Sequence, residues 1–534
     1  MKNIEQLRLT PTISNATGPT NARTFADQMS DMGVNVRTFL CDDGVPVQGD
    51  GSHDDTTGIQ RAVNTIAGLR TTAKRGNILF PPGIYQTTAA ITYELADGVF
   101  DIGFIGNPGA KLRGTFNDCL LKRSPNSPVG GVYRISCLEM ENGGATGGGI
   151  QFHSIVGGKV ECCAVSAYRG IETYNSQSVS VDSCSIGSGG LAGAVGIEAG
   201  NATTVIATDV SGTEIACRHS NAGLIWKGGR LEVNNYGFVI GQNPDGSVNG
   251  STGVDISGVS MERNNNGVFV SSASGVIISA MPITGTVGTA KQVASASWSS
   301  GAGGKITVVS AISLALFGWT SGTRPIKLEV NNGGSGGNTN YNTGAFVTGT
   351  WIDDTHFSIV RASDPGAYGI TDTFWSFKIQ TGLKINDANM IVCAAINVSA
   401  GDCEIGGVDL SAASAKNCVM IGVNCAGGPS SWRMPGFSSP GPGGSRPSFE
   451  YIMCNQPRGL DTDAAGVVAG LVYSDLPGSG TFGVQTPLVD GAEYDIIDCN
   501  TSTFLATAGG GSSGASAFRR VRYNAQAAVW QVIG

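Results

Sequence analysis

The sequence predicts an all-β fold in which the chain winds into a right-handed parallel β-helix. Glycine accounts for 80 of the 534 residues and charged residues for only 14%, a composition that disfavours long helices. From about residue 91 to 286, short apolar runs broken by Gly, Asn and Ser recur every 26 to 30 residues. Such periods indicate stacked coils, in which each turn buries its inward side chains against the next. Crossovers between parallel strands are almost always right-handed, which predicts the hand of the coil.

Two repeated fragments carry this period. Gly170-Ile171-Glu172 recurs 26 residues later as Gly196-Ile197-Glu198, and Leu231-Glu232 recurs 30 residues later as Met261-Glu262. If each repeat is one coil, the repeated glutamates occupy equivalent positions on neighbouring coils.

A capping helix is expected near the N-terminal end. Residues 49–66 read GDGSHDDTTGIQRAVNTI, and their apolar residues recur at the spacing of one helical face. Asp54 and Asp55 stand immediately before this run, where a carboxylate accepts the free amide protons of the first turn. They are therefore interpreted as capping residues and not as catalytic acids. The following segment, NILFPPGIYQTT (77–88), predicts two strands around a Pro-Pro-Gly turn.

This N-terminal segment resembles that of the pectate-lyase-like, right-handed parallel β-helix proteins, which are widespread among bacteriophage tailspikes and polysaccharide depolymerases. The resemblance covers about residues 34–90, and the chain departs from it in LCDDGVPVQ, where a short turn is usual. The matching residues are Gly49, Asp50, Gly51, Asp54, Asp55, Thr56, Phe80, Pro81, Pro82, Gly83 and Tyr85. The resemblance implies a phage tailspike that recognises and depolymerises a bacterial surface polysaccharide, assembles as a homotrimer and attaches to other tail or baseplate proteins.

Shifts in composition divide the chain into six expected segments. They are an N-terminal leader for virion attachment or for capping the first coil (1–33), the β-helix with its capping helix (34–286), an inserted β-domain (287–380), further β-helix rungs (381–428), a Gly/Pro-rich linker (429–447) and a C-terminal β-domain (448–534).

Charge and hydropathy narrow the range of possible binding partners. The net charge of −8, without a basic run, argues against nucleic acid. The sequence contains no stretch of about 18 apolar residues, the length that would predict membrane insertion. Its first residues also lack the pattern of a secretory signal. Thirteen cysteines without CxxC spacing suit folding in a reducing cytoplasm. We therefore expect synthesis in the host cytoplasm and a place in the virion tail, acting at the bacterial surface.

Catalytic candidates are carboxylates on neighbouring rungs, which lie about 4.8 Å apart, close to the about 5–5.5 Å between the carboxylates of retaining glycosidases. Glu232 and Glu262 are the preferred pair, because the inserted domain begins shortly after them and could wall a groove. Asp255 is a further candidate acid, on the same expected turn as Glu262. Glu172 and Glu198 form the rival pair. The alternative for both pairs is a structural role, as charged corners or outer-face residues.

Substrate-binding candidates lie near these acids. Arg263 is placed to hold a sugar carboxylate or to pair with a neighbouring acid. The aromatic residues Tyr236, Trp226 and Tyr174 could stack on sugar rings or pack between rungs. The four histidines show no ligand spacing, so no metal and no other cofactor is predicted.

Three functions remain open at this stage. The first is a depolymerase acting by glycoside hydrolysis with a carboxylate pair, which is favoured over the second, a lyase that needs a base at a uronic acid's C5 and a cation or Arg for the developing charge. The third is a tail protein that binds glycan without cleaving it.

Overall fold

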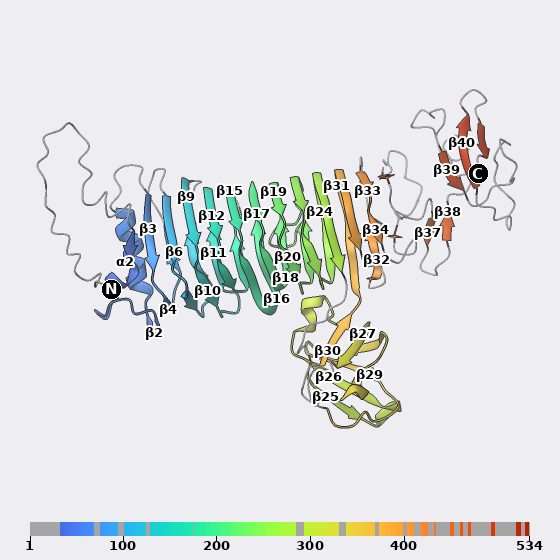
Figure 1. Cartoon of the computed structure of the whole chain (residues 1–534), viewed down its shortest axis with the longest axis horizontal. Helices are drawn as coiled ribbons and strands as arrows, with labels where there is room; N and C mark the ends of the chain where they lie inside the picture. Colours follow the sequence, from blue (N-terminus) through green and yellow to red (C-terminus); the bar gives the residue numbers. More distant parts are fainter. Residues whose placement is uncertain are drawn as a thin grey trace, which may run out of the picture.

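The computed structural model describes residues 33–68, 75–93, 101–123, 129–174, 176–284, 293–330, 338–368, 373–398, 403–410 and 418–425, together with short strands between 432 and 532. Most described residues belong to one long stack of parallel strands, whose axis is the long axis of the molecule (Figure 1). Each turn of the chain contributes a strand to three sheets in succession, called here faces 1, 2 and 3. The predicted all-β fold, a right-handed parallel β-helix, is confirmed.

Face 1 contains β1 (Val34–Asn35), β3 (Arg75–Phe80), β6 (Asp101–Gly106), β9 (Val129–Ser136), β12 (Ile155–Glu161), β15 (Gln177–Asp182), β17 (Thr203–Ile206), β19 (Asn221–Lys227), β22 (Ser251–Ser257), the middle of β24 (Asn266–Thr284), the middle of β31 (Ile379–Val398), β33 (Cys418–Ile421) and β36 (Phe449–Ile452). Every pairing within it is parallel.

Face 2 contains β2 (Asp50–Asp54), β4 (Gly83–Thr87), β7 (Ala110–Gly114), β10 (Glu139–Asn142), β13 (Ala164–Ser166), the first parts of β16 (Ser185–Ala199) and β18 (Asp209–His219), β20 (Arg230–Glu232), β23 (Ser260–Glu262), the ends of β24 and β31, and β34 (Asn424–Cys425).

Face 3 contains β5 (Ile91–Thr92), β8 (Cys119–Arg123), β11 (Gly148–Phe152), β14 (Arg169–Glu172), the last parts of β16 and β18, β21 (Tyr236–Ile240), the first parts of β24 and β31, β32 (Cys403–Asp409) and β35 (Trp432–Arg433). The parallel pairing thus continues past residue 428, through β35 and β36.

The core is a column of inward side chains stacked from rung to rung. On face 3, for example, Ile150, Ile171 and Ile197 stand at paired positions and each is fully buried. No single rung could bury its apolar side chains alone, so the stack as a whole stabilises the fold.

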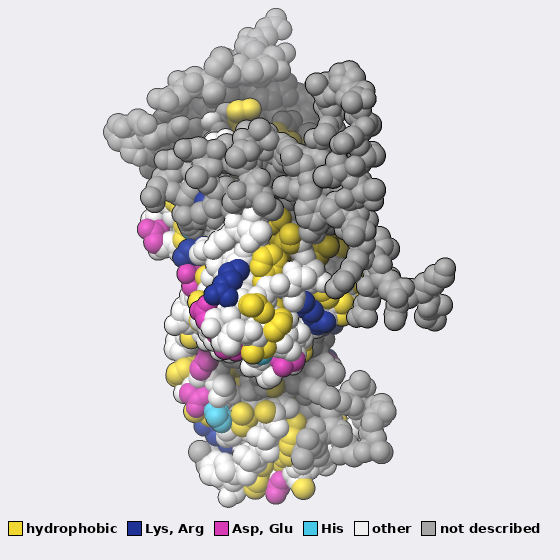
Figure 2. Space-filling model, turned by 90° about the vertical axis from the view of Figure 1, so that its left-hand side faces the viewer, with side chains coloured by type: hydrophobic (Ala, Val, Ile, Leu, Met, Phe, Trp, Pro, Cys, Tyr) yellow, Lys and Arg dark blue, Asp and Glu magenta, His cyan; other side chains and the backbone are white. Residues whose placement is uncertain are grey.

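Helix α2 (Thr56–Gly68) closes the N-terminal end of the stack (Figure 1). Its apolar face, Ile59, Ala62, Val63 and Ile66, is buried against the first rungs, as its spacing predicts. Seen along the stack from this end, acidic and basic side chains are interspersed and the described basic residues do not gather into one patch (Figure 2). No helix in the described part of the chain is long and apolar enough to cross a membrane.

The two aspartates before α2 have different roles. Asp54 accepts a hydrogen bond from the amide of Thr56, the first helical residue, and so acts as a cap as predicted. The carboxylate of Asp55 instead accepts the amides of Gln48 and Gly49 and contacts His53, so it organises the preceding loop.

Residues 293–377, called here the inserted unit, leave the stack between β24 and β31. They form a six-stranded antiparallel sheet in the order β25 (Val293–Ser299), β26 (Lys305–Ser310), β29 (His356–Val360), β28 (Val347–Trp351), β27 (Thr323–Val330) and β30 (Thr373–Phe377). Its core is aromatic, with Trp375 in contact with both Phe317 and Trp319. The unit projects from the side of the stack (Figure 1).

The remaining described elements are short. The 3₁₀ helices are η2 (Val36–Thr38), η3 (Gly301–Gly303), η4 (Leu314–Phe317) and η5 (Thr339–Tyr341). Two antiparallel sheets lie in the expected C-terminal segment, β37 (Leu460–Thr462) with β38 (Val468–Gly470), and β39 (Glu493–Ile496) with β40 (Arg519–Asn524) and β41 (Val529–Val532). The expected leader and linker lie almost wholly outside the described residues.

Candidate functional site: paired carboxylates on face 3

The Gly-Ile-Glu repeat has a steric cause. A Cβ on Gly170 would lie 2.3 Å from the carbonyl oxygen of Gly196, and one on Gly196 would lie 2.6 Å from that of Ala216. These strands therefore require glycine where the next rung approaches, and the isoleucine that follows enters the core. Glu172 and Glu198 then stand directly opposite each other on β14 and β16.

Each carboxylate of this pair is bound by an arginine. Glu172 is 8% exposed and pairs with Arg169 at 2.9 Å, while Gln151 donates a hydrogen bond to it at 2.7 Å. Glu198 is 6% exposed and pairs with Arg218 at 2.8 Å. The two like charges are thus held side by side with counter-charges around them.

Burial raises the pKa of Glu198 to about 7, although the neighbouring Arg218 opposes the shift and the charge of Glu172 adds to it. A carboxyl group with this pKa is substantially protonated at neutral pH and can donate a proton. The pair therefore combines one carboxyl group suited to be an acid with a second on the adjacent rung.

The pair preferred from the sequence, Glu232 and Glu262, is also in register, on β20 and β23. Glu232 forms ion pairs with Arg263 at 2.8 Å and Arg230 at 3.2 Å. Ser260 donates to Glu262 at 3.3 Å. Arg263 thus pairs with a neighbouring acid of the protein, which was one of the two roles expected for it. Both Glu232 and Glu262 are more exposed than the face 3 pair.

The corner beside Glu232 is built from an asparagine ladder. Asn234 donates to Asn264 at 2.9 Å, and Asn265 donates to Asn235 at 2.8 Å, all four side chains being buried. Arg324 of the inserted unit donates to Asn265 here, which fixes the unit to the corner between faces 2 and 3.

Asp255 is not brought to either pair. It lies on β22 in face 1 and forms an ion pair with Lys227 at 2.7 Å, whereas Glu232 and Glu262 belong to face 2. Its predicted role as their partner acid is therefore wrong, because one turn of the coil spreads its three strands over three faces.

Trp226 is the second correction among the predicted site residues. Its side chain is fully buried and packs edge-on against Phe238, with ring centroids 5.0 Å apart. It cannot stack on a sugar, and its indole N–H donates to the carbonyl of Gly228 inside the protein.

The other two predicted aromatic residues lie on or beside face 3. Tyr236 is half-buried, with its ring 6.2 Å from that of Phe269. Tyr174 is half-buried against His153. Phe269 and Lys384 were missed by sequence reasoning, although they continue the outward row of Glu198 along the stack. Counting the register from rung to rung is the signal that could have found them.

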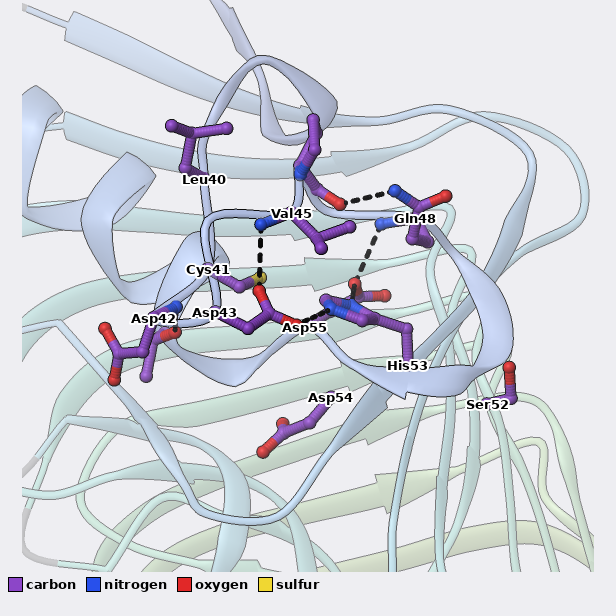
Figure 3. Close-up of polar contacts among 12 residues, drawn as sticks. Leu40, Cys41, Asp42, Asp43, Val45, Gln48, Ser52, His53, Asp54 and Asp55 are labelled. Atoms are coloured by element: carbon purple, nitrogen blue, oxygen red, sulfur yellow. Dashed lines mark hydrogen bonds and ion pairs between the residues drawn. The ribbon is translucent and has the colours of Figure 1, made fainter.

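Histidine spacing predicts no metal site, yet the N-terminal loop brings three possible ligands together. Atoms of Cys41, His53 and Asp55 lie within 4.8 Å of one another (Figure 3). This cluster is far along the chain from the paired carboxylates.

The chain thus folds as a three-sided parallel β-helix, whose face 3 carries two opposed and almost buried carboxyl groups. Among known proteins, no family model matches this chain and no curated protein matches its sequence. Solved structures of phage proteins do match, with low sequence identity.

The tailspike protein of E. coli bacteriophage HK620 is one of these structures. A mutant of it is 12% identical, with a TM-score of 0.45, over 82% of this chain and 67% of that chain. A double mutant in complex with a pentasaccharide is 10% identical, with a TM-score of 0.41, over 79% and 65%. ORF18 of Geobacillus virus E2 is 10% identical, with a TM-score of 0.36, over 95% and 76%. The present chain thus spans less than two thirds of the chain of that double mutant.

Proposed function

We propose that this protein is a bacteriophage tailspike that binds a bacterial surface polysaccharide, such as a capsule, an exopolysaccharide or an O-antigen, and hydrolyses it at Glu172 and Glu198. The observation that carries the proposal is the register of these two carboxylates, together with the pKa of Glu198, raised to about 7 by burial. The N-terminal resemblance to tailspikes and depolymerases supports the same class.

The chemistry follows the retaining scheme, since neighbouring strands are about 4.8 Å apart and retaining pairs are separated by about 5–5.5 Å. Glu198 donates its proton to the glycosidic oxygen as the C–O bond breaks. Glu172 attacks the anomeric carbon and forms a glycosyl ester. Glu198, now a carboxylate, then takes a proton from water, whose oxygen displaces Glu172 and releases the sugar.

Neighbouring side chains suit a sugar chain lying along face 3. Tyr236 and Phe269 offer ring surface further along the stack, and Lys384 lies 5.7 Å from the ring of Phe269. The inserted unit is anchored at the adjacent corner, where it could wall the bound polysaccharide.

The test uses the full chain and a panel of purified capsular, exopolysaccharide and O-antigen preparations. Glu172→Gln and Glu198→Gln should each lower the release of reducing ends by about 10²-fold or more, since the amide can neither transfer a proton nor form the ester. Polysaccharide binding should persist in both variants. The matched control is the pair Glu232→Gln and Glu262→Gln, which should retain cleavage.

Two other results would change the proposed site or the proposed reaction. Loss of cleavage only in the Glu232 and Glu262 variants would move the site to face 2. An unsaturated product, seen by its ultraviolet absorbance, would indicate a lyase instead of a hydrolase.

A second function is favoured by one observation: both glutamates of face 3 are nearly buried and already bound by arginines, as in a structural ladder. This supports a tail protein that binds its glycan without cleaving it. Binding to a polysaccharide in the panel without any new reducing ends would establish this alternative.

We further propose that the protein is a homotrimer in the virion tail, attached to other tail or baseplate proteins. Isoleucines on the outer side of face 1 support self-association, because Ile206, Ile225 and Ile277 are 41%, 42% and 47% exposed. Light scattering at micromolar concentration should give three times the chain mass, and Ile225→Glu with Ile277→Glu should lower it. A monomeric wild-type protein would refute the assembly.

A further inference from the structure

The loop before helix α2 folds back so that side chains distant in the chain converge. His53 lies between two carboxylates, with Nδ1 at 2.8 Å from Asp55 and Nε2 at 2.9 Å from Asp43 (Figure 3). The sulfur of Cys41 completes a group of three donor atoms that all lie within 4.8 Å of one another. Cys41 and Asp55 are buried and His53 is partly exposed, so the group is reachable from solvent on one side.

The local fold holds this group together. A Cβ on Gly58 would lie 2.8 Å from the sulfur of Cys41 and 2.3 Å from Val47, so only glycine lets the loop pack against the first turn of α2. The backbone amides of Gln48 and Gly49 fix the Asp55 carboxylate. The loop and the helix thus position a thiol, an imidazole and a carboxylate.

We propose that Cys41, His53 and Asp55 bind a zinc ion, with Asp43 as the residue that positions His53. Thiolate sulfur, imidazole nitrogen and carboxylate oxygen are the ligands that zinc takes in proteins, in tetrahedral geometry. Three protein ligands leave the fourth position to water.

The placement of Asp43 supports this assignment. Histidines that bind zinc through one nitrogen commonly donate the other N–H to a carboxylate, which fixes the ring and strengthens the ligand. Here Nδ1 faces Asp55 and Nε2 faces Asp43. Zinc would replace the proton between Nδ1 and Asp55, and these two atoms would separate by about half an ångström to reach metal distances of about 2.0–2.2 Å.

The consequence for the molecule is a metal staple at the end of the stack. Cys41 lies in the loop, whereas Asp55 directly precedes α2, so an ion between them ties the loop to the capping helix. Because such a site is absent from the unfolded chain, zinc should stabilise the folded state by an amount that rises with the logarithm of the free zinc concentration once that concentration exceeds Kd.

The experiment uses the purified full chain, stripped with a chelator and titrated with Co²⁺ as a spectroscopic substitute and then with Zn²⁺. We expect a thiolate-to-cobalt charge-transfer band in the near ultraviolet, loss of that band when Zn²⁺ is added, and a rise in Tm with Zn²⁺. Cys41→Ser should abolish the band and His53→Gln should weaken Zn²⁺ binding. Asp43→Asn, which leaves all three ligands in place, should weaken it by about tenfold or more.

Among the described cysteines, Cys137 and Cys162 are exposed and require a control. The variant Cys137→Ser with Cys162→Ser should keep both the band and the zinc-dependent rise in Tm. Circular dichroism verifies that each variant is folded. A band that persists in Cys41→Ser, one that disappears in the double serine variant, or no band in the folded wild-type protein would overturn the proposal.

Discussion

Replacing Glu198 by glutamine should change how the stability of the protein depends on pH. The ordinary pKa of this carboxyl group is 4.5, and burial raises it to about 7 in the folded state. The folded protein therefore holds the proton more tightly than the unfolded chain. The stabilisation is complete below about pH 4.5, falls as the pH rises, and is lost above about pH 7.

The magnitude follows from the shift. Each pKa unit corresponds to about 1.36 kcal/mol, so a rise of about 2.5 units predicts a loss of about 3 kcal/mol between pH 4.5 and pH 8. Glutamine keeps the shape of the side chain and can still accept from Arg218, but it has no proton to lose. The variant should therefore lack this part of the pH dependence.

Urea unfolding of wild type and Glu198→Gln at intervals from pH 4.5 to pH 8 measures the effect. The difference between their free energies of unfolding should move by about 3 kcal/mol in favour of the variant as the pH rises, because contributions shared by both proteins cancel. Glu139→Gln, at an exposed carboxylate on face 2, should show a far smaller change. A difference that is constant with pH, or that moves toward the wild type, would refute the assigned environment of Glu198.

Three further predictions test the packing. Trp226→Ala should lower the free energy of unfolding by about 3–5 kcal/mol in urea titrations, since it empties a fully buried site, and Trp226→Phe should cost less. Arg324→Met leaves buried acceptors, including Asn265, without their donor, which should lower the free energy of unfolding of the inserted unit by about 2 kcal/mol or more. Limited proteolysis should therefore release this unit faster than in the wild type. Gly170→Ala should lower Tm, since its Cβ meets backbone, whereas Gly301→Ala, in open space, should leave Tm unchanged; equal effects at both glycines would contradict the steric argument.

The sequence predicted the fold best at positions where the structure allows only one type of residue for steric reasons. The repeat of Gly170 at Gly196 reflects close backbone approach between rungs, so its period reported the true register of the stack. The amphipathic spacing of α2 likewise predicted its buried face. In both cases the signal is local and repeats with the geometry of the element itself.

Position on the three faces was less accessible from the sequence. Trp226 follows an apolar strand pattern that fits either side of a sheet, and only the register with the buried Val205 and Ile256 shows that it points into the core. Asp255 precedes Glu262 by seven residues, enough to carry the chain around a corner onto another face. The proximity of Cys41 and His53 depends on the path of an irregular loop. Such a loop has no sequence repeat from which the contact could be predicted.

The charges along face 3 give a physical reason to look for function there. Opposite charges on neighbouring rungs stabilise a stack, as with Lys111 and Glu139 on face 2, whereas like charges at opposed positions destabilise it. Glu172 and Glu198 are two acidic groups, opposed and almost buried, although Gln151 on the preceding rung shows that an amide fits the same row. Proteins retain such locally unfavourable arrangements chiefly at functional sites. The less buried pair on face 2 carries a smaller desolvation cost, which is why the face 3 pair is the stronger candidate for catalysis.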